Sequence, residues 1–406
     1  MTMRTNAKSF LFVPSKVLTL CGVWPVEKTS LFSVIYRSIM LSSQFCFLVF
    51  NGIYIGLMWG DLKAVSDALY MFFTQTTCCS KAIGFYFNFL KIKRIVASMD
   101  DVLFTAMSIE DQATIFSHSR TVNKLYKGVL GFTGFTLVQW TVLSLIGSER
   151  TLPFNEMWVP TDISKTPNYE ITFVVELWMM VISAALFMSV DTITVATMMF
   201  SCAQLDIIMK KTQQIQEIPL SPELSSRNRS ELHEKNNGIL IDCIKHHQAI
   251  VRFSELCEGT FQVHSFFHLG GIVFMICVIG FRMAGESPVS AQFWAALSYL
   301  VIILGQLYLY CWCANELTTK SEQLRDTLYL TPWYDQDMKF KRNLCIAMEC
   351  MAKSLTFRAG SYIPLSRAMF VSILRSSYSY FAFLNQANEQ YHVLDQQKSA
   401  ENKDSK

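Results

Sequence analysis

The sequence predicts an all-α membrane protein that crosses the bilayer seven times, and three observations support this. Hydrophobic residues make up 51% of the 406 residues and charged residues only 17%, whereas soluble domains carry about 25% charged residues. Apolar runs of the length that a span needs, about 20 residues, occur seven times along the chain. Lysine and arginine gather between alternate runs, which indicates a fixed orientation in the membrane.

The seven apolar runs are the predicted membrane spans. They cover residues 31–59, 64–90, 128–147, 169–199, 259–281 and 291–314, with a last span within 361–386. The N-terminal stretch MTMRTNAKSFLFVPSKVL contains no uninterrupted apolar core, because Pro14 and Lys16 break it. No cleavable signal is therefore expected, and the first span is expected to direct the chain to the membrane.

Three helices are predicted to continue beyond the bilayer. No glycine or proline stands between Pro167 and Pro219, so one helix can run over residues 169–211. At 1.5 Å per residue it would extend about 64 Å, twice a hydrocarbon core of about 30 Å. The amphipathic stretches 231–256, before the fifth span, and 315–329, after the sixth, follow the same pattern. We expect the three extensions to pack into one bundle outside the membrane.

The basic residues place the N-terminus and this bundle in the cytosol. The segments 1–38, 91–127, 210–252 and 320–358 hold 25 of the 35 lysines and arginines, and basic loops stay on the cytosolic side. Seven spans then put the C-terminus outside. The chain divides into two parts. Residues 1–330 hold helices one to six and their extensions, and residues 331–406 hold a cytosolic anchor helix, the last span and a short external tail.

Signatures of enzymes, metal sites and nucleic-acid binding are absent from the sequence. His264 and His268 stand four residues apart, but a serine occupies the place of the glutamate that a zinc-protease helix needs. Both histidines are predicted to be structural, and the stretch 245–248 is predicted to form a solvated face. Cys311 and Cys313 have the wrong spacing for a redox pair and are predicted to pack in the interior. The net charge of only +3 is too small to indicate a nucleic-acid partner. Because the motifs are absent, no metal or cofactor is expected either.

The last span carries a polar stripe. Ser372, Ser376, Ser379, Phe383 and Gln386 follow the spacing i, i+4, i+7, i+11 and i+14, which places them on one face of a helix. A polar stripe on an apolar helix is expected to face water or another subunit. One copy cannot enclose a pore, but several copies around an axis can.

Four motifs resemble those of the insect odorant receptor family. They are the ending SLTFRAGSYIPLSRAMFVSILRSSYSYFAFLNQ, the sixth-span exit YLYCWCANELTTKSEQL, the early LCGVWP and the external WVPTD. The resemblance covers the whole chain in length, span order and orientation. It implies an odorant-gated, nonselective cation channel in the plasma membrane of olfactory sensory neurons. Members of that family work as tetramers, most often as a tuning subunit combined with a shared olfactory co-receptor.

The chain resembles a tuning subunit rather than the co-receptor. The co-receptor has a much longer cytosolic loop between spans four and five, which here covers only residues 215–229. One alternative is a gustatory-type ligand-gated channel, which the ending SYSYFAFL disfavours. The other is a G-protein-coupled receptor, which requires the opposite orientation, an external cysteine at the third span and Asn-Pro-x-x-Tyr in the seventh. The sequence contains neither motif.

The resemblance implies an odorant pocket between helices two to six, in the outer half of the membrane. A small apolar ligand needs an aromatic, hydrophobic cavity with one or two polar groups that orient it. Gln139 is the predicted polar contact, because an amide inside a span needs a partner. The predicted set, whose members share helix faces, is Phe72, Phe73, Thr76, Gln139, Leu143, Trp178, Ile182, Phe267, Gly271, Phe293, Trp294 and Leu297.

The same resemblance places a hydrophobic gate at Phe383 and Ala387, with Gln386 as polar lining beside them. A hydrophobic ring closes a pore by dewetting, and a ligand opens it by binding the dilated state more tightly. Arg375 flanks the stripe. Because a lining arginine would oppose cation flow, Arg375 is predicted to pair with an acidic residue of a neighbouring subunit.

Three further charged residues lie inside predicted spans, where charges mark function more often than at a surface. Glu176 and Asp191 are in the fourth span, and Lys81 is in the second. Pairing between helices or snorkelling, with Glu176 within reach of the headgroups, is favoured over a role in gating.

Overall fold

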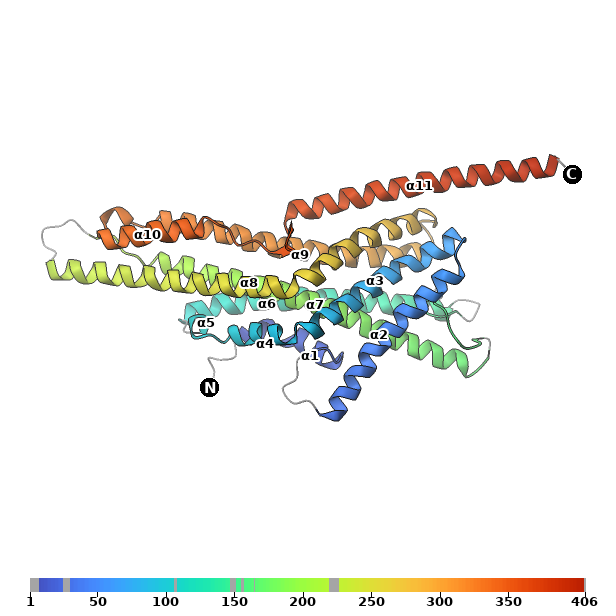
Figure 1. Cartoon of the computed structure of the whole chain (residues 1–406), viewed down its shortest axis with the longest axis horizontal. Coiled ribbons are helices and arrows are strands. Elements are labelled where there is room, and N and C mark those ends of the chain that lie inside the picture. Colours follow the sequence, from blue (N-terminus) through green and yellow to red (C-terminus); the bar gives the residue numbers. More distant parts are fainter. Residues whose placement is uncertain are drawn as a thin grey trace.

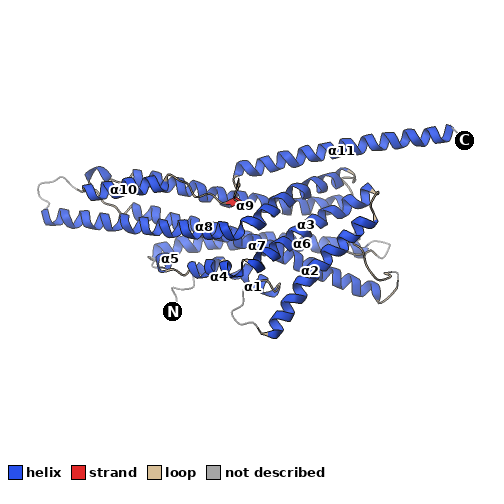
Figure 2. Cartoon of the chain, viewed as in Figure 1, coloured by secondary structure: helices blue, strands red, loops and turns tan. Residues whose placement is uncertain are grey.

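The computed structural model describes residues 7–24, 30–105, 108–146, 151–154, 157–163, 165–218 and 226–404. Within these ranges it describes all side chains except those of 7–8, 62–63, 226, 384 and 387–404. The described chain is almost entirely helical (Figure 2). The helices are α1 (Phe12–Leu20), α2 (Leu31–Leu57), α3 (Leu62–Phe87), α4 (Phe89–Ser98), α5 (Val102–Thr105), α6 (Ile109–Ile146), α7 (Asn168–Thr212), α8 (Ser226–Ala284), α9 (Ala291–Tyr329), α10 (Met338–Met351) and α11 (Arg367–Asp404), with the short 3-10 turns η2 (Ala7–Phe10) and η3 (Trp333–Asp335).

Seven long helices occupy the positions of the seven predicted spans: α2, α3, α6, α7, α8, α9 and α11. Within the described residues, five of them, α2, α6, α7, α8 and α9, are long and apolar enough to cross a membrane by length and composition. The other two, α3 and α11, are interrupted by polar residues, among them Gln75, Lys81 and Arg375. The fold is that of a polytopic, all-α membrane protein.

Long helix extensions pack into the expected bundle. Helices α7, α8 and α9 contain 45, 59 and 39 residues, and each packs against the other two. Figure 1 shows their extensions together with α10 at the end of the molecule opposite the C-terminus. With 38 residues, α6 is a fourth overlong helix. The prediction began its span at residue 128, because the preceding residues are polar enough to end an apolar run.

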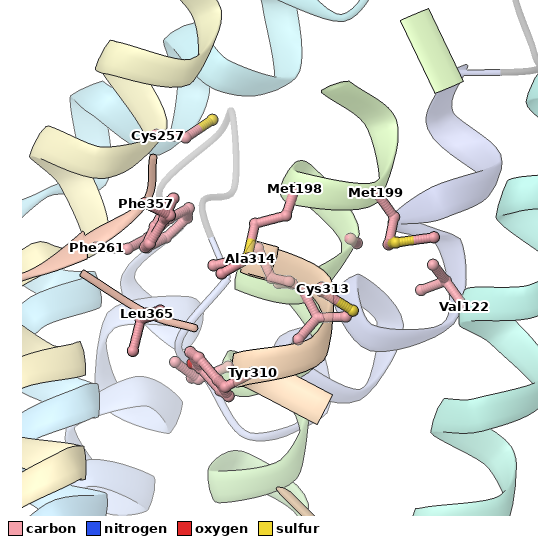
Figure 3. Packing of buried hydrophobic residues seen from close by; sticks show 14 of the residues in the cluster. Val122, Met198, Met199, Cys257, Phe261, Tyr310, Cys313, Ala314, Phe357 and Leu365 are labelled. Atoms are coloured by element: carbon pink, nitrogen blue, oxygen red, sulfur yellow. The ribbon is translucent and has the colours of Figure 1, made fainter. Parts of the chain in front are cut away.

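Helix α7 forms the centre of the hydrophobic core. Its side chains are buried almost without interruption from Leu186 to Ile208, because α7 packs against α1, α6, α8 and α9. Figure 3 shows Met198 and Met199 of α7 between Val122 of α6 and Ala314 of α9. Apolar side chains of all these helices therefore join into one continuous cluster.

A short hairpin leads from the anchor helix α10 into α11. Strand β1 (Arg358–Ala359) pairs antiparallel with β2 (Ile363–Pro364). The Gly360 amide donates to the carbonyl of Gln262 in α8 at 2.9 Å, which docks the hairpin on α8. Helix α11 then runs beside α8 and α9 and extends away from the rest of the molecule (Figure 1). It continues to Asp404, so the predicted short tail is helical.

The prediction for residues 245–248 is wrong for the two histidines. Lys245 and Gln248 are exposed, but His246 and His247 are only 3% and 7% exposed. The cause is the packing of α8 against α7, where His246 Nε2 lies 2.9 Å from Gln204 Oε1 in a hydrogen bond. The two histidines belong to the interior of the bundle of helix extensions.

Candidate ligand-binding site

An inner cavity of about 60 Å³ lies among α2, α3, α6, α7 and α9. Four large aromatic side chains line it: Phe47, Trp140, Phe187 and Tyr299. Methionine, isoleucine and leucine supply most of the remaining wall. The cavity therefore suits a small apolar molecule, in keeping with the general character of ligand pockets.

The polar groups of the inner cavity are bonded to one another. Gln75 of α3 donates from Nε2 to the carbonyl oxygen of Gln44 at 2.9 Å and to its Oε1 at 3.1 Å. Ser183 of α7 donates to Gln75 Oε1 at 2.9 Å, and the hydroxyls of Thr74 and Tyr299 are hydrogen-bonded. These hydrogen bonds link α2 with α3 and α7, and α3 with α9. A ligand that forms a hydrogen bond with one of these groups must therefore replace a hydrogen bond between helices.

An outer cavity of about 260 Å³ lies between α3, α6, α8, α9 and the segment 151–154. Trp140 and Tyr299 line both cavities and form the wall between them. Arg282 of α8 gives the outer cavity a charged group. Its Nε lies 3.4 Å from Asp67 Oδ1, and its guanidinium carbon lies 5.1 Å from the centre of the Tyr70 ring. The outer cavity is thus more polar than the inner one.

A buried ion pair lies next to the inner cavity. Lys81 Nζ of α3 lies 2.8 Å from both carboxylate oxygens of Asp191 in α7. Tyr310 and Gln306 of α9 donate to the same carboxylate at 2.9 and 3.2 Å. The Lys81 ammonium also lies 3.3 Å from the centre of the Phe187 ring, which lines the cavity. The predicted pairing between helices is confirmed for Lys81 and Asp191.

The other charged and metal-binding candidates are interior groups. Glu176 is fully buried in α7, so its expected reach to the headgroups is wrong. His264 and His268 are buried in α8, and His268 Nε2 lies 3.7 Å from Asp191 Oδ2. Across the described residues no group of three or more metal-ligating side chains comes together. Cys311 and Cys313 are buried free thiols, as predicted.

Among the predicted pocket residues, one lines a cavity and three contact neighbouring helices. Leu143 lines the outer cavity. Gln139 accepts a hydrogen bond from Ser298 Oγ at 3.2 Å, so its amide has a partner within the protein. Phe73 stacks on Phe274 at 5.0 Å. A Cβ added at Gly271 would lie 3.1 Å from Thr77 Oγ1, which means that α8 and α3 meet closely there.

Of the twelve predicted pocket residues, Leu143 alone lines the inner or the outer cavity. Half-buried positions are Phe72, Ile182, Phe293 and Leu297, and exposed ones are Thr76, Trp178, Phe267 and Trp294. The sequence interpretation missed Tyr70, Thr74, Gln75, Trp140 and Tyr299, which stand one or two residues from predicted positions. Polar Thr74 and Gln75 in the second span were the one signal that could have indicated the correct face.

The polar stripe of α11 is exposed. Ser372, Ser376, Ser379, Phe383 and Gln386 are all exposed within the chain. The side chain of Ala387 lies outside those the structure describes. The stripe is therefore available for water or for other subunits.

The opposite face of α11 packs on α8. Ile373 and Ser377 are buried, and Ser377 Oγ donates to the carbonyl of Val273 at 3.4 Å. Arg375 is exposed, and none of the ion pairs among the described residues includes it.

These features define a polytopic helical membrane protein with a small apolar cavity inside its bundle and a polar-striped helix outside it. The chain matches the family described as 7tm Odorant receptor over residues 61–378. Because this match covers most of the chain, the protein belongs to the odorant receptor family of insects.

Individual odorant receptors are similar to this chain over long stretches of sequence. Odorant receptor Or1 of Anopheles gambiae is 22% identical over 387 residues, which cover 90% of this chain and 93% of that protein. Odorant receptor 30a of Drosophila melanogaster is 24% identical over 255 residues, 61% of this chain and 63% of the relative. The olfactory receptor OR5 of Machilis hrabei, solved in complex with eugenol, has a TM-score of 0.78 at 15% identity, covering 94% of this chain and 98% of that one. The last comparison shows that the fold is shared.

Proposed function

We propose that the chain is the odorant-binding tuning subunit of a heteromeric, ligand-gated, nonselective cation channel, assembled with an olfactory co-receptor as a heterotetramer. The proposal places it in the plasma membrane of olfactory sensory neurons, with the N-terminus cytosolic and the C-terminus extracellular. The observation that carries it is the exposed polar stripe of α11 on a chain that belongs to the odorant receptor family.

Ligand binding is supported by the cavities. The inner cavity is apolar and aromatic, and it lies among helices α2, α3, α6, α7 and α9. Burial of a volatile organic molecule there removes apolar surface from water at a gain of about 25 cal/mol per Å². In this proposal, an odorant that fills the inner cavity moves the lining helices apart as it binds. That movement supplies the differential affinity that gating needs.

Channel activity is supported by α11. Its stripe of three serines and a glutamine would line a wet path, and Phe383, 68% exposed, would close that path in a ring of several subunits. The predicted site residues Ser372, Ser376, Ser379, Phe383, Gln386 and Ala387 form this proposed pore and gate.

Co-expression with the co-receptor in oocytes tests the function. An odorant panel applied under voltage clamp is expected to evoke a cation current that needs both subunits. The co-receptor alone is the control. A chain that reaches the surface with its co-receptor but yields no current with any odorant would argue against the proposal.

Epitope tags test the orientation. A tag after Lys406 is expected to bind antibody on intact cells, whereas a tag before Met1 is expected to bind only after permeabilisation. A C-terminal tag that is accessible only in permeabilised cells would show the orientation of a G-protein-coupled receptor and contradict the channel proposal.

A further inference from the structure

A third cavity opens on the outside of the bundle between α6 and α7. This α6–α7 groove has a volume of about 480 Å³ and no charged residue in its lining. Val138 and Val142 of α6 and Val181 of α7 line it and are exposed. Both helices are long and apolar enough to cross a membrane, and α11 packs on α8 and α9 instead. The groove therefore faces the acyl chains of the bilayer.

The groove and the inner cavity share a wall that is one side chain thick. Thr133, Leu137 and Ala184 line both. Two of these side chains are small, and the Thr133 hydroxyl is already bonded to the Val129 carbonyl at 2.9 Å within α6. Leucine can change rotamer without breaking a hydrogen bond. A rotation of Leu137 is thus enough to begin joining the groove to the cavity.

The wall toward the outer cavity is harder to open. It consists of Trp140 and Tyr299, whose rings lie 5.6 Å apart, and each also packs against Tyr70 at 6.3 and 5.6 Å. The Tyr299 hydroxyl is hydrogen-bonded to Thr74. Moving either ring breaks aromatic contacts or a buried hydrogen bond. A ligand on this route would also pass Arg282, which is paired with Asp67.

We propose that ligands reach the inner cavity sideways from the bilayer, through the α6–α7 groove, with Leu137 as the moving partition, and leave by the same route. The inference rests on the proposed odorant-receptor function and deepens it. It identifies the ligand class as small, uncharged molecules that concentrate in lipid. Each added methylene favours the bilayer by about fourfold, so the groove meets a far higher ligand concentration than the water-facing cavity does.

Filling the groove tests the route. At Gly134, which lines the groove, an added Cβ would meet no atom within 4 Å, so the Gly134→Phe side chain starts in open space and is expected to fill the groove. With an odorant that activates the wild type, we expect the rise and the decay of the current to slow by about tenfold each. The concentration for half-maximal current at long exposure stays unchanged, because a blocked route slows binding and release equally.

Two further variants control for misfolding. Gly128→Phe places the same side chain on the same helix but outside the groove lining. A Cβ at Gly128 also meets no atom within 4 Å. This variant is expected to keep wild-type kinetics. Val181→Phe fills the groove from α7 and is expected to repeat the slowing if Gly134→Phe fails to reach the surface. An external tag on each variant reports its surface level.

The outer cavity supplies the opposite test. Gln292 is exposed and lines that cavity. A membrane-impermeant thiol reagent applied to Gln292→Cys is expected to leave both rates unchanged, with the wild type and the same reagent as control. Slowing by the reagent, together with wild-type rates in the two groove variants, would show a route from water and overturn the proposal.

Three other results also decide whether the groove is the route. A shifted half-maximal concentration in Gly134→Phe without slower kinetics would make the groove part of the binding site rather than a route, and would overturn the proposal. Normal currents with wild-type rates in both groove variants reject the route but leave the receptor function standing. No odorant current in the wild type rejects the function, and the route with it.

Discussion

Lys81 and Asp191 place a full ion pair among apolar helices. Removing two charges from water is costly, and their attraction offsets that cost only when the remaining hydrogen-bonding sites are also satisfied. Here Tyr310 and Gln306 donate to the carboxylate, and the Phe187 ring covers the ammonium. Because these groups come from α3, α7 and α9, the pair fixes the mutual position of three helices next to the inner cavity.

We predict that Asp191→Asn lowers the free energy of unfolding by about 3–5 kcal/mol, the cost of leaving one member of a buried pair alone. The double variant Lys81→Met with Asp191→Leu is expected to lose less, because neither charge then stays buried without its partner. Thermal unfolding of the detergent-solubilised receptor, followed by size-exclusion chromatography, measures both. Asp162→Asn removes one member of the exposed pair with Lys165 and serves as a control, with an expected change under about 1 kcal/mol. An Asp191→Asn receptor as stable as this control would refute the prediction.

His246 and His247 predict that the bundle of helix extensions is sensitive to acid. Burial lowers the pKa of His247 from 6.5 to about 4, and burial together with the nearby Lys211 does the same for His246. As the pH falls below 6.5, the unfolded chain takes up protons before the folded chain does. Stability is therefore expected to fall between pH 6.5 and about 4, by up to about 1.4 kcal/mol per pH unit for each group. Melting temperatures over this range, with His247→Gln as the comparison, measure the effect. The variant should show a shallower slope, and an unchanged slope would contradict the assignment.

At the scale of the element, apolar runs located the helices well but not their faces. The sequence predicted a helix over 169–211, and α7 spans Asn168–Thr212. In a span that touches both lipid and protein, however, apolar residues are stable on every side, so their spacing does not show which face meets a cavity. Phe73 was predicted to contact ligand and instead stacks on Phe274, while its neighbours Thr74 and Gln75 line the inner cavity.

Helix α11 shows when periodicity does resolve a face. Its stripe of Ser372, Ser376 and Ser379 stands beside apolar positions such as Val371, Ile373 and Leu374, and this contrast defines a direction that a uniformly apolar span lacks. Ser372, Ser376 and Ser379 are exposed and Ile373 is buried, in agreement with the predicted stripe. The function of that face as a pore lining still depends on the neighbouring subunits, which no single sequence or chain contains.

The hairpin before α11 gives a prediction at the same scale. Gly360 has a φ of +60°, and a Cβ added there would lie 2.8 Å from Phe266 Cδ2. Gly360→Ala is therefore expected to lower the free energy of unfolding by about 1–2 kcal/mol from the backbone alone, and by more from the clash with Phe266. Thermal unfolding in detergent measures it, with Gly305→Ala as the control, because a Cβ at that position meets no atom within 4 Å. Equal melting temperatures for the two variants would refute the strain at the turn.

At the scale of the whole molecule, α8 lies between the inner cavity and α11. Met275 of α8 is buried, and its sulfur lies 3.2 Å from Thr74 Oγ1, beside the wall of the inner cavity. On another face of α8, a Cβ at Gly280 would lie 3.3 Å from the Phe381 ring of α11. Because both contacts are tight, we expect a ligand that spreads the cavity to displace α8 against α11, two residues before the proposed gate at Phe383.

This arrangement predicts the effect of a polar gate. In receptors assembled with the co-receptor, Phe383→Ser is expected to raise the current without odorant severalfold, because a ring that contains a hydroxyl stays wet where a phenylalanine ring excludes water. Basal current and reversal potential under changed external cations provide the measurement. Tyr378→Ser is the matched control. Tyr378 is also exposed, at 70%, but its position on α11 is about 140° away from that of Phe383, so basal current should stay at the wild-type level. If Phe383→Ser leaves basal current and ion selectivity unchanged at a normal surface level, Phe383 does not form the gate, and the constriction must lie elsewhere along the stripe.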